Sequence, residues 1–192
     1  MKMKIIRGGH RKSPLSRTPV PGCSGTVAIE FALIAPVLAL FLFGIVETGM
    51  IFFAQSTLQN ASDDAARLVR TGQAQNNGMT EAQYVQQICG EMSGLIGTSS
   101  CTSNLQVDMQ SFADFSEANY NNVVNRNGSL NASQMQYVTG GPCDVVLVRS
   151  FYPWSIMTPF LAPLLANMPN GQYLLTAAAA FRNEPYASSA AC

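Results

Sequence analysis

The chain has 192 residues, of which 47% are hydrophobic and 11% are charged, and its formal net charge is zero. This zero is a sum of opposite charges: residues 1–25 carry six basic residues and no acid, whereas residues 26–192 carry five arginines, no lysine and eleven acids. The long acidic part has no basic patch, which excludes a nucleic-acid-binding function.

Residues 1–25 are the first expected element, a basic leader that ends at Gly25. A hydrophobic segment starts directly after it. Because a short basic flank before a hydrophobic helix is held on the cytoplasmic side of a membrane, we expect the remainder of the chain to lie across the membrane. The change of character between Gly25 and Thr26 is typical of a processing site.

An apolar span follows the leader. Residues 31–46 carry no charge, and apolar residues resume after Glu47. About 20 residues are enough to cross a bilayer. The run is longer than the roughly 7 to 15 apolar residues of a secretory signal, and no convincing cleavage site follows it. We therefore interpret the span as a retained anchor rather than a removed signal.

Apolar residues continue at helical spacing beyond this span. Successive members lie four, three, four and three residues apart: Ala54, Leu58, Ala61, Ala65 and Leu68. One helix is therefore predicted from about Thr26 to Thr71, about 69 Å long, with Gly72 as the residue that ends it. Pro36 should bend or loosen the first third of this helix.

Two acids interrupt the apolar part of the predicted helix. An ionised carboxylate in hydrocarbon costs about 2.5 kcal/mol or more, so Glu30 is a candidate functional residue. The alternative is that Glu30 reaches back to the membrane interface. Glu47 should lie near the outer interface, where a solvated side chain is the favoured interpretation.

Small residues recur near Glu30. Their spacings of four, three and four place them on one stripe of a helix: Ala28, Ala32, Ala35 and Ala39. Such a stripe lets two helices approach closely in a membrane. The alternative is that these are ordinary alanines in a helix-forming run.

The distal residues 73–192 predict a small α+β domain. Residues 73–80 indicate a polar linker, and Thr80 with Glu81 begins a second, amphipathic helix that Gly97 should stop. Three later segments have the pattern of strands and predict a small antiparallel sheet: Leu105 to Phe112, Asp144 to Tyr152 and Tyr173 to Arg182. The alanines at 177–180 also suit a helix.

Two connections complete this domain. Residues 113–142 are rich in Asn, Ser, Gly and Gln, which indicates a long surface excursion or a partly ordered loop. Residues 152–169 contain four prolines among apolar residues and predict an apolar crossover with one short helix. This crossover could pack on the sheet or on a partner, and packing on the sheet is the favoured interpretation.

Four cysteines lie beyond the leader, which itself contains Cys23: Cys89, Cys101, Cys143 and Cys192. An even number fits an oxidising compartment, so at least one disulfide is expected. Three pairings are possible. Joining the first two would close the shortest loop, and joining the last two would fasten the C-terminus; the alternative is that some are free, buried thiols.

Few catalytic groups are available. The only histidine, His10, lies in the leader, so residues 26–192 contain neither His nor Lys. No Ser-His or Cys-His pair, His-based metal site, Lys nucleophile or glycine-rich phosphate loop can be built there. Asp108 with Asp114 or Glu117 could support acid–base chemistry or hold calcium, but such scatter is commoner in solvated loops. We expect no enzyme activity, cofactor, metal or small-molecule substrate.

The N-terminal pattern resembles a known family. Gly25 followed by Glu30 and Phe31 is similar to the type IV prepilin processing pattern. Further motifs are similar, in register, to TadE-like minor pseudopilins of tight-adherence (Flp) pilus systems: Phe31-Ala-Leu-Ile-Ala-Pro36-Val-Leu, Gly44-Ile-Val-Glu47-Thr-Gly49, Leu58-Gln-Asn-Ala61 and Asp64-Ala-Ala-Arg67. The resemblance covers roughly 50 residues; beyond them only Arg182-Asn-Glu-Pro-Tyr186 is loosely similar.

The resemblance implies cleavage between Gly25 and Thr26 by a prepilin peptidase at the cytoplasmic face. Glu30 would then neutralise the N-terminal ammonium of Thr26 in a neighbouring subunit. Other implied partners are pilins or pseudopilins, inner-membrane pilus assembly proteins and the lipid bilayer. The implied location is the bacterial inner membrane, with one span, a cytoplasmic N-terminus and a periplasmic domain, or a place within or at the tip of a pilus.

Two other functions remain open at this stage. The chain could be an unprocessed, membrane-anchored TadG-like protein with a periplasmic scaffold domain, or a bitopic periplasmic enzyme. The mature N-terminus distinguishes the pseudopilin from the TadG-like scaffold.

Overall fold

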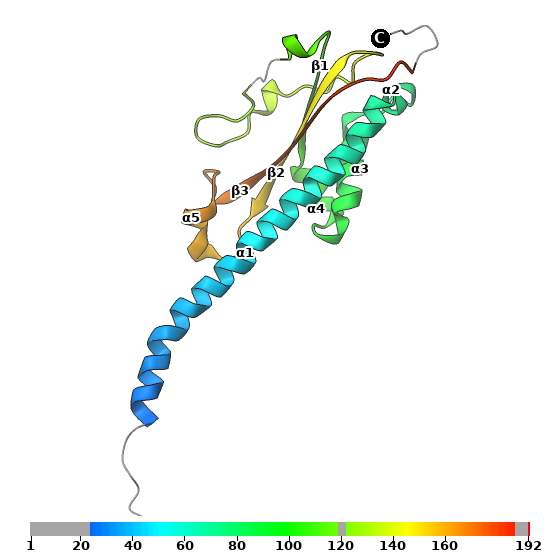
Figure 1. The fold of residues 1–192 in the computed structure, drawn as a ribbon. Helices are drawn as coiled ribbons and strands as arrows, with labels where there is room; N and C mark the ends of the chain where they lie inside the picture. The colour runs from blue at the N-terminus through cyan, green and yellow to red at the C-terminus, as the bar shows by residue number, and fades with distance from the viewer. Residues whose placement is uncertain (1–23, 119–121, 187–191) are drawn as a thin grey trace, which may run out of the picture. The chain divides into compact units, whose positions relative to one another are not determined.

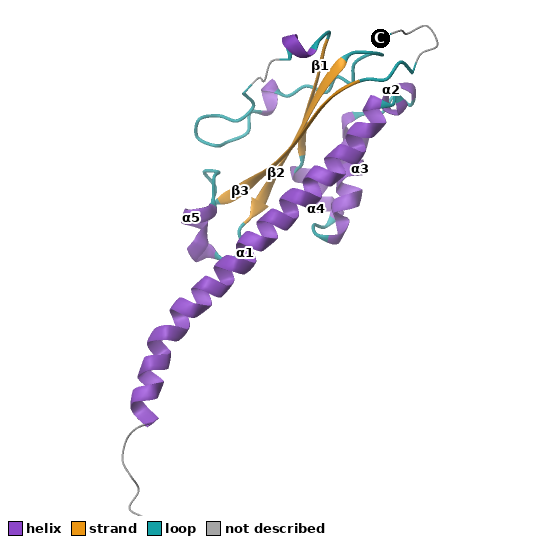
Figure 2. Cartoon of the chain, in the orientation of Figure 1, coloured by secondary structure: helices purple, strands orange, loops and turns teal. Residues whose placement is uncertain are grey.

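The computed structural model describes residues 24–118, 122–186 and 192, so residues 1–23 of the expected leader lie outside the described part. The chain divides into two compact units, one up to Leu40 and one from Phe41 onward. The structure contains one long helix, several short helices and a three-stranded sheet, which confirms the predicted α+β fold (Figures 1 and 2).

The helices are one long element and several short ones. They are α1 (Ser24–Arg70), α2 (Gln73–Asn76), α3 (Glu81–Glu91), α4 (Thr98–Asn104) and α5 (Ala162–Leu165), with the 3₁₀ turns η1 (Met92–Gly94), η2 (Phe115–Glu117), η3 (Ala132–Gln134) and η4 (Pro159–Leu161). The strands β1 (Gln106–Phe112), β2 (Val145–Ser155) and β3 (Gln172–Arg182) form an antiparallel sheet in the order β1-β2-β3. All three predicted strands are confirmed, including the alanine run at 177–180.

Gly72 ends α1 as predicted, and the C-terminal segment explains why only glycine fits there. Its φ of 76° lies in the left-handed region that favours glycine. A Cβ at this position would collide with the ring of Tyr186. The Glu184 amide also donates to the Arg70 carbonyl at 2.8 Å. The end of α1 is therefore fastened by residues more than a hundred positions later.

The connection after α1 differs from the predicted linker. Residues 73–76 form α2, because Ala74 packs into the core and the Gln75 side chain donates to the Thr139 carbonyl at 2.8 Å. The predicted start of the next helix is confirmed. Thr80 caps α3 in a capping box with Gln83. The α-helix itself ends at Glu91, before the predicted stop at Gly97, and α4 follows as an element that the sequence pattern did not indicate.

The core lies between one face of the sheet and the helices α1 and α3. Alternate residues of β2 face these helices, and the stripe predicted on α1 supplies the facing surface (Figure 1). The buried members from α1 are Ile51, Ala54, Leu58, Ala61, Ala65 and Val69. Because three of these six are alanines, the helix backbone can lie close to the sheet and to α3.

Two glutamines of α1 occupy the open edge of the sheet. The Gln55 side chain accepts from the Thr176 amide and donates to its carbonyl, and Gln59 does the same with Ala178. Four helical residues rise about 6 Å and two strand residues about 6.6 Å, so the two spacings match. Four backbone groups on the β3 edge, the N–H and C=O of Thr176 and of Ala178, are thus hydrogen-bonded by side chains, as a neighbouring strand would do.

The interpretation of Asp108 as a solvated loop residue was wrong. It lies fully buried in β1, directly opposite Arg149 of β2, with Nη2 and Oδ2 2.6 Å apart. The Gln110 side chain and the Gln136 amide also donate to this carboxylate. A buried carboxylate with these partners is a structural ion pair, since removing one partner would leave an uncompensated charge.

Described residues of the excursion at 113–142, among them Val123, pack on the second face of the sheet. Residues near Tyr137 pair with β1: the Met109 amide donates to the Gln136 carbonyl, and the Val138 amide donates to the Met109 carbonyl. Val123 packs with Phe151 and Leu174 in a small second cluster. The polar composition indicated a loop correctly, but not that this loop supplies the cover of Asp108.

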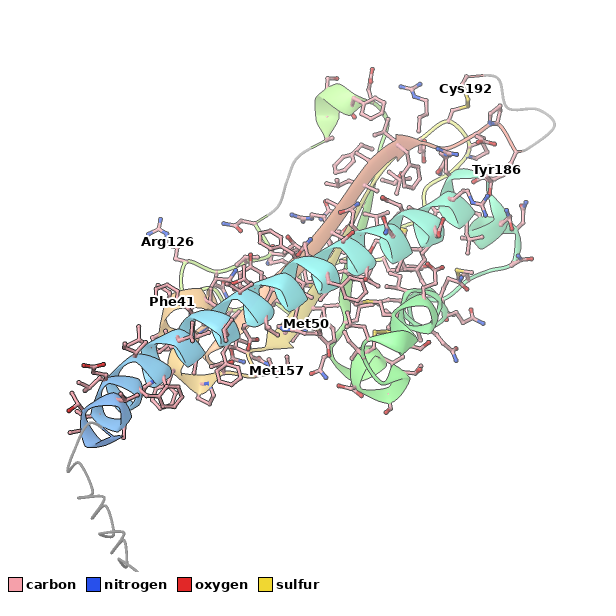
Figure 3. The ribbon with its side chains drawn as sticks, turned by 60° about the horizontal axis from the view of Figure 1, so that its bottom comes forward. Phe41, Met50, Arg126, Met157, Tyr186 and Cys192 are labelled. Carbon is pink, nitrogen blue, oxygen red and sulfur yellow. A yellow bond between two sulfur atoms is a disulfide. The ribbon has the colours of Figure 1, made fainter. Side chains whose placement is uncertain are left out.

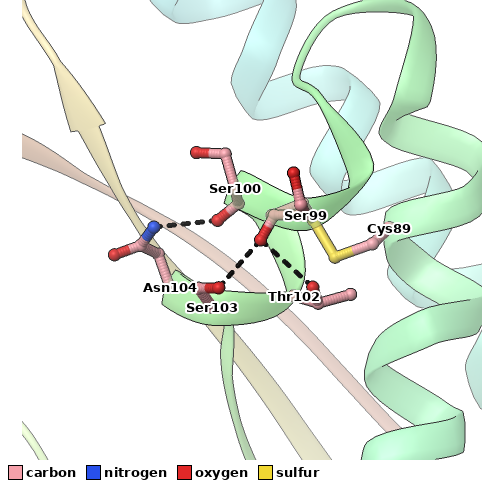
Figure 4. The surroundings of a disulfide bond; sticks show 7 residues. Cys89, Ser99, Ser100, Thr102, Ser103 and Asn104 are labelled. Carbon is pink, nitrogen blue, oxygen red and sulfur yellow. Dashed lines mark hydrogen bonds between the residues drawn. A yellow bond between two sulfur atoms is a disulfide. The ribbon is translucent and has the colours of Figure 1, made fainter.

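Both disulfides join cysteines that lie beyond the leader. Cys89 of α3 pairs with Cys101 of α4, with Cα atoms 5.6 Å apart, and Cys143 pairs with Cys192. Figure 4 shows why α4 benefits from the first bond: its Thr, Ser and Asn side chains bond back to the carbonyls of Ser99 and Ser100. Such residues compete with helix formation, so the crosslink holds a weak helix against α3.

The buried Tyr84 and the half-buried Tyr137 make the stability of the domain sensitive to alkaline pH. Burial, with the charges of Tyr137 and Asp63, raises the pKa of Tyr84 far above its usual value, and burial with Glu81 raises the pKa of Tyr137 to about 12. Unfolded tyrosine titrates near pH 10. The neutral phenols therefore contribute full stability below about pH 10, and this contribution is lost as the pH rises from there towards 12.

We expect Tyr84→Phe to remove much of this alkaline loss. The Tyr84 hydroxyl has no hydrogen-bond partner among the described residues, so the substitution breaks no bond in the core. Thermal unfolding of the full chain in detergent, followed by circular dichroism between pH 7 and 11.5, measures the effect. The two chains should melt alike at pH 7, and equal slopes above pH 10 would contradict the assignment.

Candidate assembly site on the N-terminal helix

The first part of α1 presents a continuous apolar surface. Its large side chains are between 50% and 71% exposed: Val27, Ile29, Phe31, Leu33, Ile34, Val37, Leu38, Leu40, Phe41, Leu42, Phe43, Ile45 and Val46. Among the described residues, α1 is the one helix long and apolar enough to cross a membrane. A surface of this size needs lipid or protein to cover it.

Glu30 lies exposed within this surface. No described residue hydrogen-bonds or pairs with its carboxylate, and Phe31 beside it is 70% exposed. Gly25 and Thr26, at the predicted processing site, are also exposed at the start of α1. A Cβ added to Gly25 would meet no atom within 4 Å, so the fold itself does not require glycine there.

The four stripe alanines are all on α1, and Pro36 lies among them without ending the helix. Ala28 and Ala32 are exposed, whereas Ala35 and Ala39 are half-buried. The stripe and Glu30 thus occur within the same few turns of an exposed helix. This arrangement can hold a second helix closely and place a positive group near the acid.

The interpretation of Glu47 as a solvated acid was wrong. Its side chain is only 2% exposed, because the crossover after β2 covers it. The amides of Met157 and Thr158 donate to its two oxygens at 3.1 and 3.0 Å, and the Thr158 hydroxyl donates at 3.0 Å. Figure 3 shows Met157 beside the stretch of α1 between Phe41 and Met50.

These bonds make Glu47 the anchor of the crossover. Thr158 is the N-cap of η4, so the carboxylate satisfies amides at the start of a helical turn. One turn earlier on α1, a Cβ at Gly44 would lie 3.8 Å from Leu161 Cδ1. The crossover is therefore held against α1 by a charged contact and an apolar one.

Sequence reasoning missed three groups that fix the helix to the domain. Thr158, Gln55 and Gln59 all bond across more than a hundred positions of sequence. A signal existed for the glutamines, since two Gln at helical spacing beside a buried stripe can reach a neighbouring element. No local pattern links Thr158 to Glu47, because helical and strand periodicity relate only residues that are near one another in sequence, and these two are 111 positions apart.

These features define a class of protein: one with a long, apolar and exposed N-terminal helix, a lone acid near its start and a small α+β domain. Residues 25–67 match the family model described as TadE-like protein, which confirms the resemblance over this segment. The match covers less than a quarter of the chain; it is consistent with a component associated with a tight-adherence pilus system and is compatible with membrane anchoring. Searches of curated proteins and of solved structures found no match.

The matched segment ends within α1. It includes Gly25, Glu30 and Glu47, and it stops at Arg67, before α1 itself ends at Arg70. The sheet, α3 and both disulfides therefore lie outside the segment on which the resemblance rests.

We expect Glu47→Gln to loosen the crossover and lower the free energy of unfolding by about 1–3 kcal/mol, since an amide group would face two backbone donors. Asp64→Asn is the matched control, because Asp64 is an exposed acid on the same helix. Urea unfolding in detergent and limited proteolysis around residues 156–166 measure the change. Equal stability and equal protection of the two variants would contradict an anchoring role.

Proposed function

We propose that this protein is a processed minor pseudopilin of a tight-adherence pilus system. It is anchored in the bacterial inner membrane by α1, with a cytoplasmic N-terminus and a periplasmic domain. A prepilin peptidase removes residues 1–25, and the helix then packs against other pilins or pseudopilins. The observation that carries this proposal is an exposed apolar helix with one unpartnered carboxylate five residues after Gly25.

The exposed surface of α1 is suited both to contact with lipid and to packing against a second helix. Lipid covers large apolar side chains well, and small residues allow a second helix to approach. Both kinds of residue occur on the first turns of α1, where the large side chains of Phe31 and Leu33 and the small ones of Ala28 and Ala32 are all exposed. A helix that first lies in lipid and later packs laterally in a fibre needs both properties.

Glu30 supports the pairing role. A carboxylate in hydrocarbon costs about 2.5 kcal/mol or more when it is alone, and an adjacent positive charge offsets this cost. Processing would create an ammonium on Thr26, close to Glu30 along the helix axis. Pairing between subunits would therefore favour one register of two helices over its neighbours.

The distal domain suits an oxidising compartment. Both disulfides connect elements of this domain, and such bonds persist outside the cytosol. The charge asymmetry of the chain independently favours a cytoplasmic leader and a translocated domain. The proposed periplasmic location is thus supported by two unrelated properties.

Processing can be tested on the N-terminus. With the partner peptidase present, mass analysis should show loss of residues 1–25, and Gly25→Leu should block it because a bulky side chain enters the cleavage position. Gly49→Leu is the control, since a Cβ at either glycine meets no atom within 4 Å. An intact Met1 on the unmodified chain in the membrane fraction would overturn the pseudopilin proposal.

Pairing can be tested separately from processing. We expect Glu30→Ala to leave cleavage largely intact but to impair incorporation or pilus production, because the Thr26 ammonium of the neighbour loses its partner. Asp64→Ala removes an exposed acid further along α1 and should have little effect. Counting pili and measuring the cleaved fraction of both variants gives the result, and normal piliation with Glu30→Ala would count against the pairing role.

A further inference from the structure

The crossover between β2 and β3 exposes an apolar surface that the domain does not cover. Phe160 is 87% exposed, Leu164 is 80% exposed and Met157 is 62% exposed. In the same turns Leu161 is buried next to Gly44 of α1, and Leu165 is half-buried and packs against the core. Own-domain packing, the favoured prediction for this segment, therefore accounts for only one of its two faces.

No charge accompanies this surface along the chain. From Ser150 to Phe181 the sequence contains no Asp, Glu, Lys, Arg or His. A crossover facing water on its outer side would normally be polar there. Between Ile156 and Ala166 the one hydroxyl, that of Thr158, is already bonded to Glu47.

The backbone of the crossover is suited to a medium without water. Glu47 satisfies the amides of Met157 and Thr158, and Leu161, Ala162 and Ala166 donate to carbonyls within the segment. Pro159 and Pro163 have no amide hydrogen to satisfy. Contact with hydrocarbon therefore costs this segment less than it would cost an ordinary loop.

The position of the crossover along α1 sets its depth. About 20 helical residues cross the hydrocarbon core. Counted from Thr26 they reach Ile45, and counted from Phe31 they reach Met50. Leu161 lies at the level of Gly44, and Thr158 is bonded to Glu47. Either count thus puts the crossover at the outer edge of the same hydrocarbon layer.

We propose that residues 156–166 insert into the outer leaflet of the membrane that α1 crosses, with Met157, Phe160 and Leu164 in contact with lipid. The exposed apolar residues Phe41 to Val46 of α1 lead directly to Glu47, and the bonds of Glu47 to Met157 and Thr158 hold this segment at the required depth. The crossover is then a second lipid contact that sets the height and tilt of the domain above the membrane. This inference rests on the membrane anchoring in the proposed function.

The test uses tryptophan as a reporter of lipid contact. The full chain with Phe160→Trp or Leu164→Trp is placed in phosphatidylethanolamine–phosphatidylglycerol vesicles that contain brominated acyl chains, which quench indole on contact. Phe115→Trp is the control. Phe115 is also exposed, but it follows the last residue of β1, which pairs with the first residue of β2, whereas the crossover follows the last residue of β2. The two positions therefore lie at opposite ends of the strands. The unmodified chain gives the background of Trp154.

We expect blue-shifted emission and loss of intensity for Phe160→Trp and Leu164→Trp, independent of the protein-to-lipid ratio, and neither change for Phe115→Trp. The proposal would be overturned if the emission of Phe160→Trp had the same red wavelength as that of the control and were equally unquenched. So would a blue shift without quenching that fades on dilution with lipid, since a second copy of the chain would then be the occupant.

Vesicle flotation separates the two proposals. A chain that floats but is not quenched at position 160 retains the anchor and loses the crossover contact. A chain that does not float overturns the anchor and the crossover contact together.

Discussion

The contact between Glu47 and the start of the crossover is the interaction on which the rest of the structure depends. On its N-terminal side α1 is bare and apolar; beyond it the same helix forms the wall of a core. The carboxylate is stable at this point only because Met157 and Thr158 supply three donors from a segment 110 and 111 positions away. Glu47 therefore lies where the exposed apolar part of α1 ends and the part that packs on the domain begins.

Helix α1 has to meet two different requirements, and its composition changes accordingly. The exposed part carries large side chains such as Phe31 and Phe43, which gain from a medium without water. The packed part carries alanines and glutamines, because a helix lying close to a sheet edge must be narrow and must also satisfy backbone groups. Gln55 and Gln59 hydrogen-bond the backbone of β3, and the Tyr186 ring packs beside Gly72, just after the C-terminal end of α1.

Period and charge predicted a large part of the fold. The glycine at 72, the Thr80 cap and the three strands all follow from local patterns, and each was found. The first four residues of the predicted stripe are buried, but Leu68 is only half-buried and Val69 occupies the core in its place. Errors arose where a polar residue was judged by its neighbours in sequence. Asp108 and Glu47 were assigned to water because acids usually face it, yet both have partners supplied by distant segments.

The candidate assembly site is almost wholly a property of sequence. Gly25, Glu30 and the alanine stripe are defined by spacing on one helix, so helical periodicity alone brings them together. The exposed face of the crossover could not be obtained that way. Its apolar composition was evident, but composition cannot say which of two leucine-rich faces is covered.

The sequence by itself determined the long apolar helix, the acid near its start and the presence of a small α+β domain, because periodicity and composition act over short distances. Only the tertiary structure decided which acids are buried, which edge of the sheet is covered and which face of the crossover is open. Those outcomes depend on contacts such as Glu47 with Thr158, and burial of a charge is decided by whether such donors arrive from elsewhere in the chain.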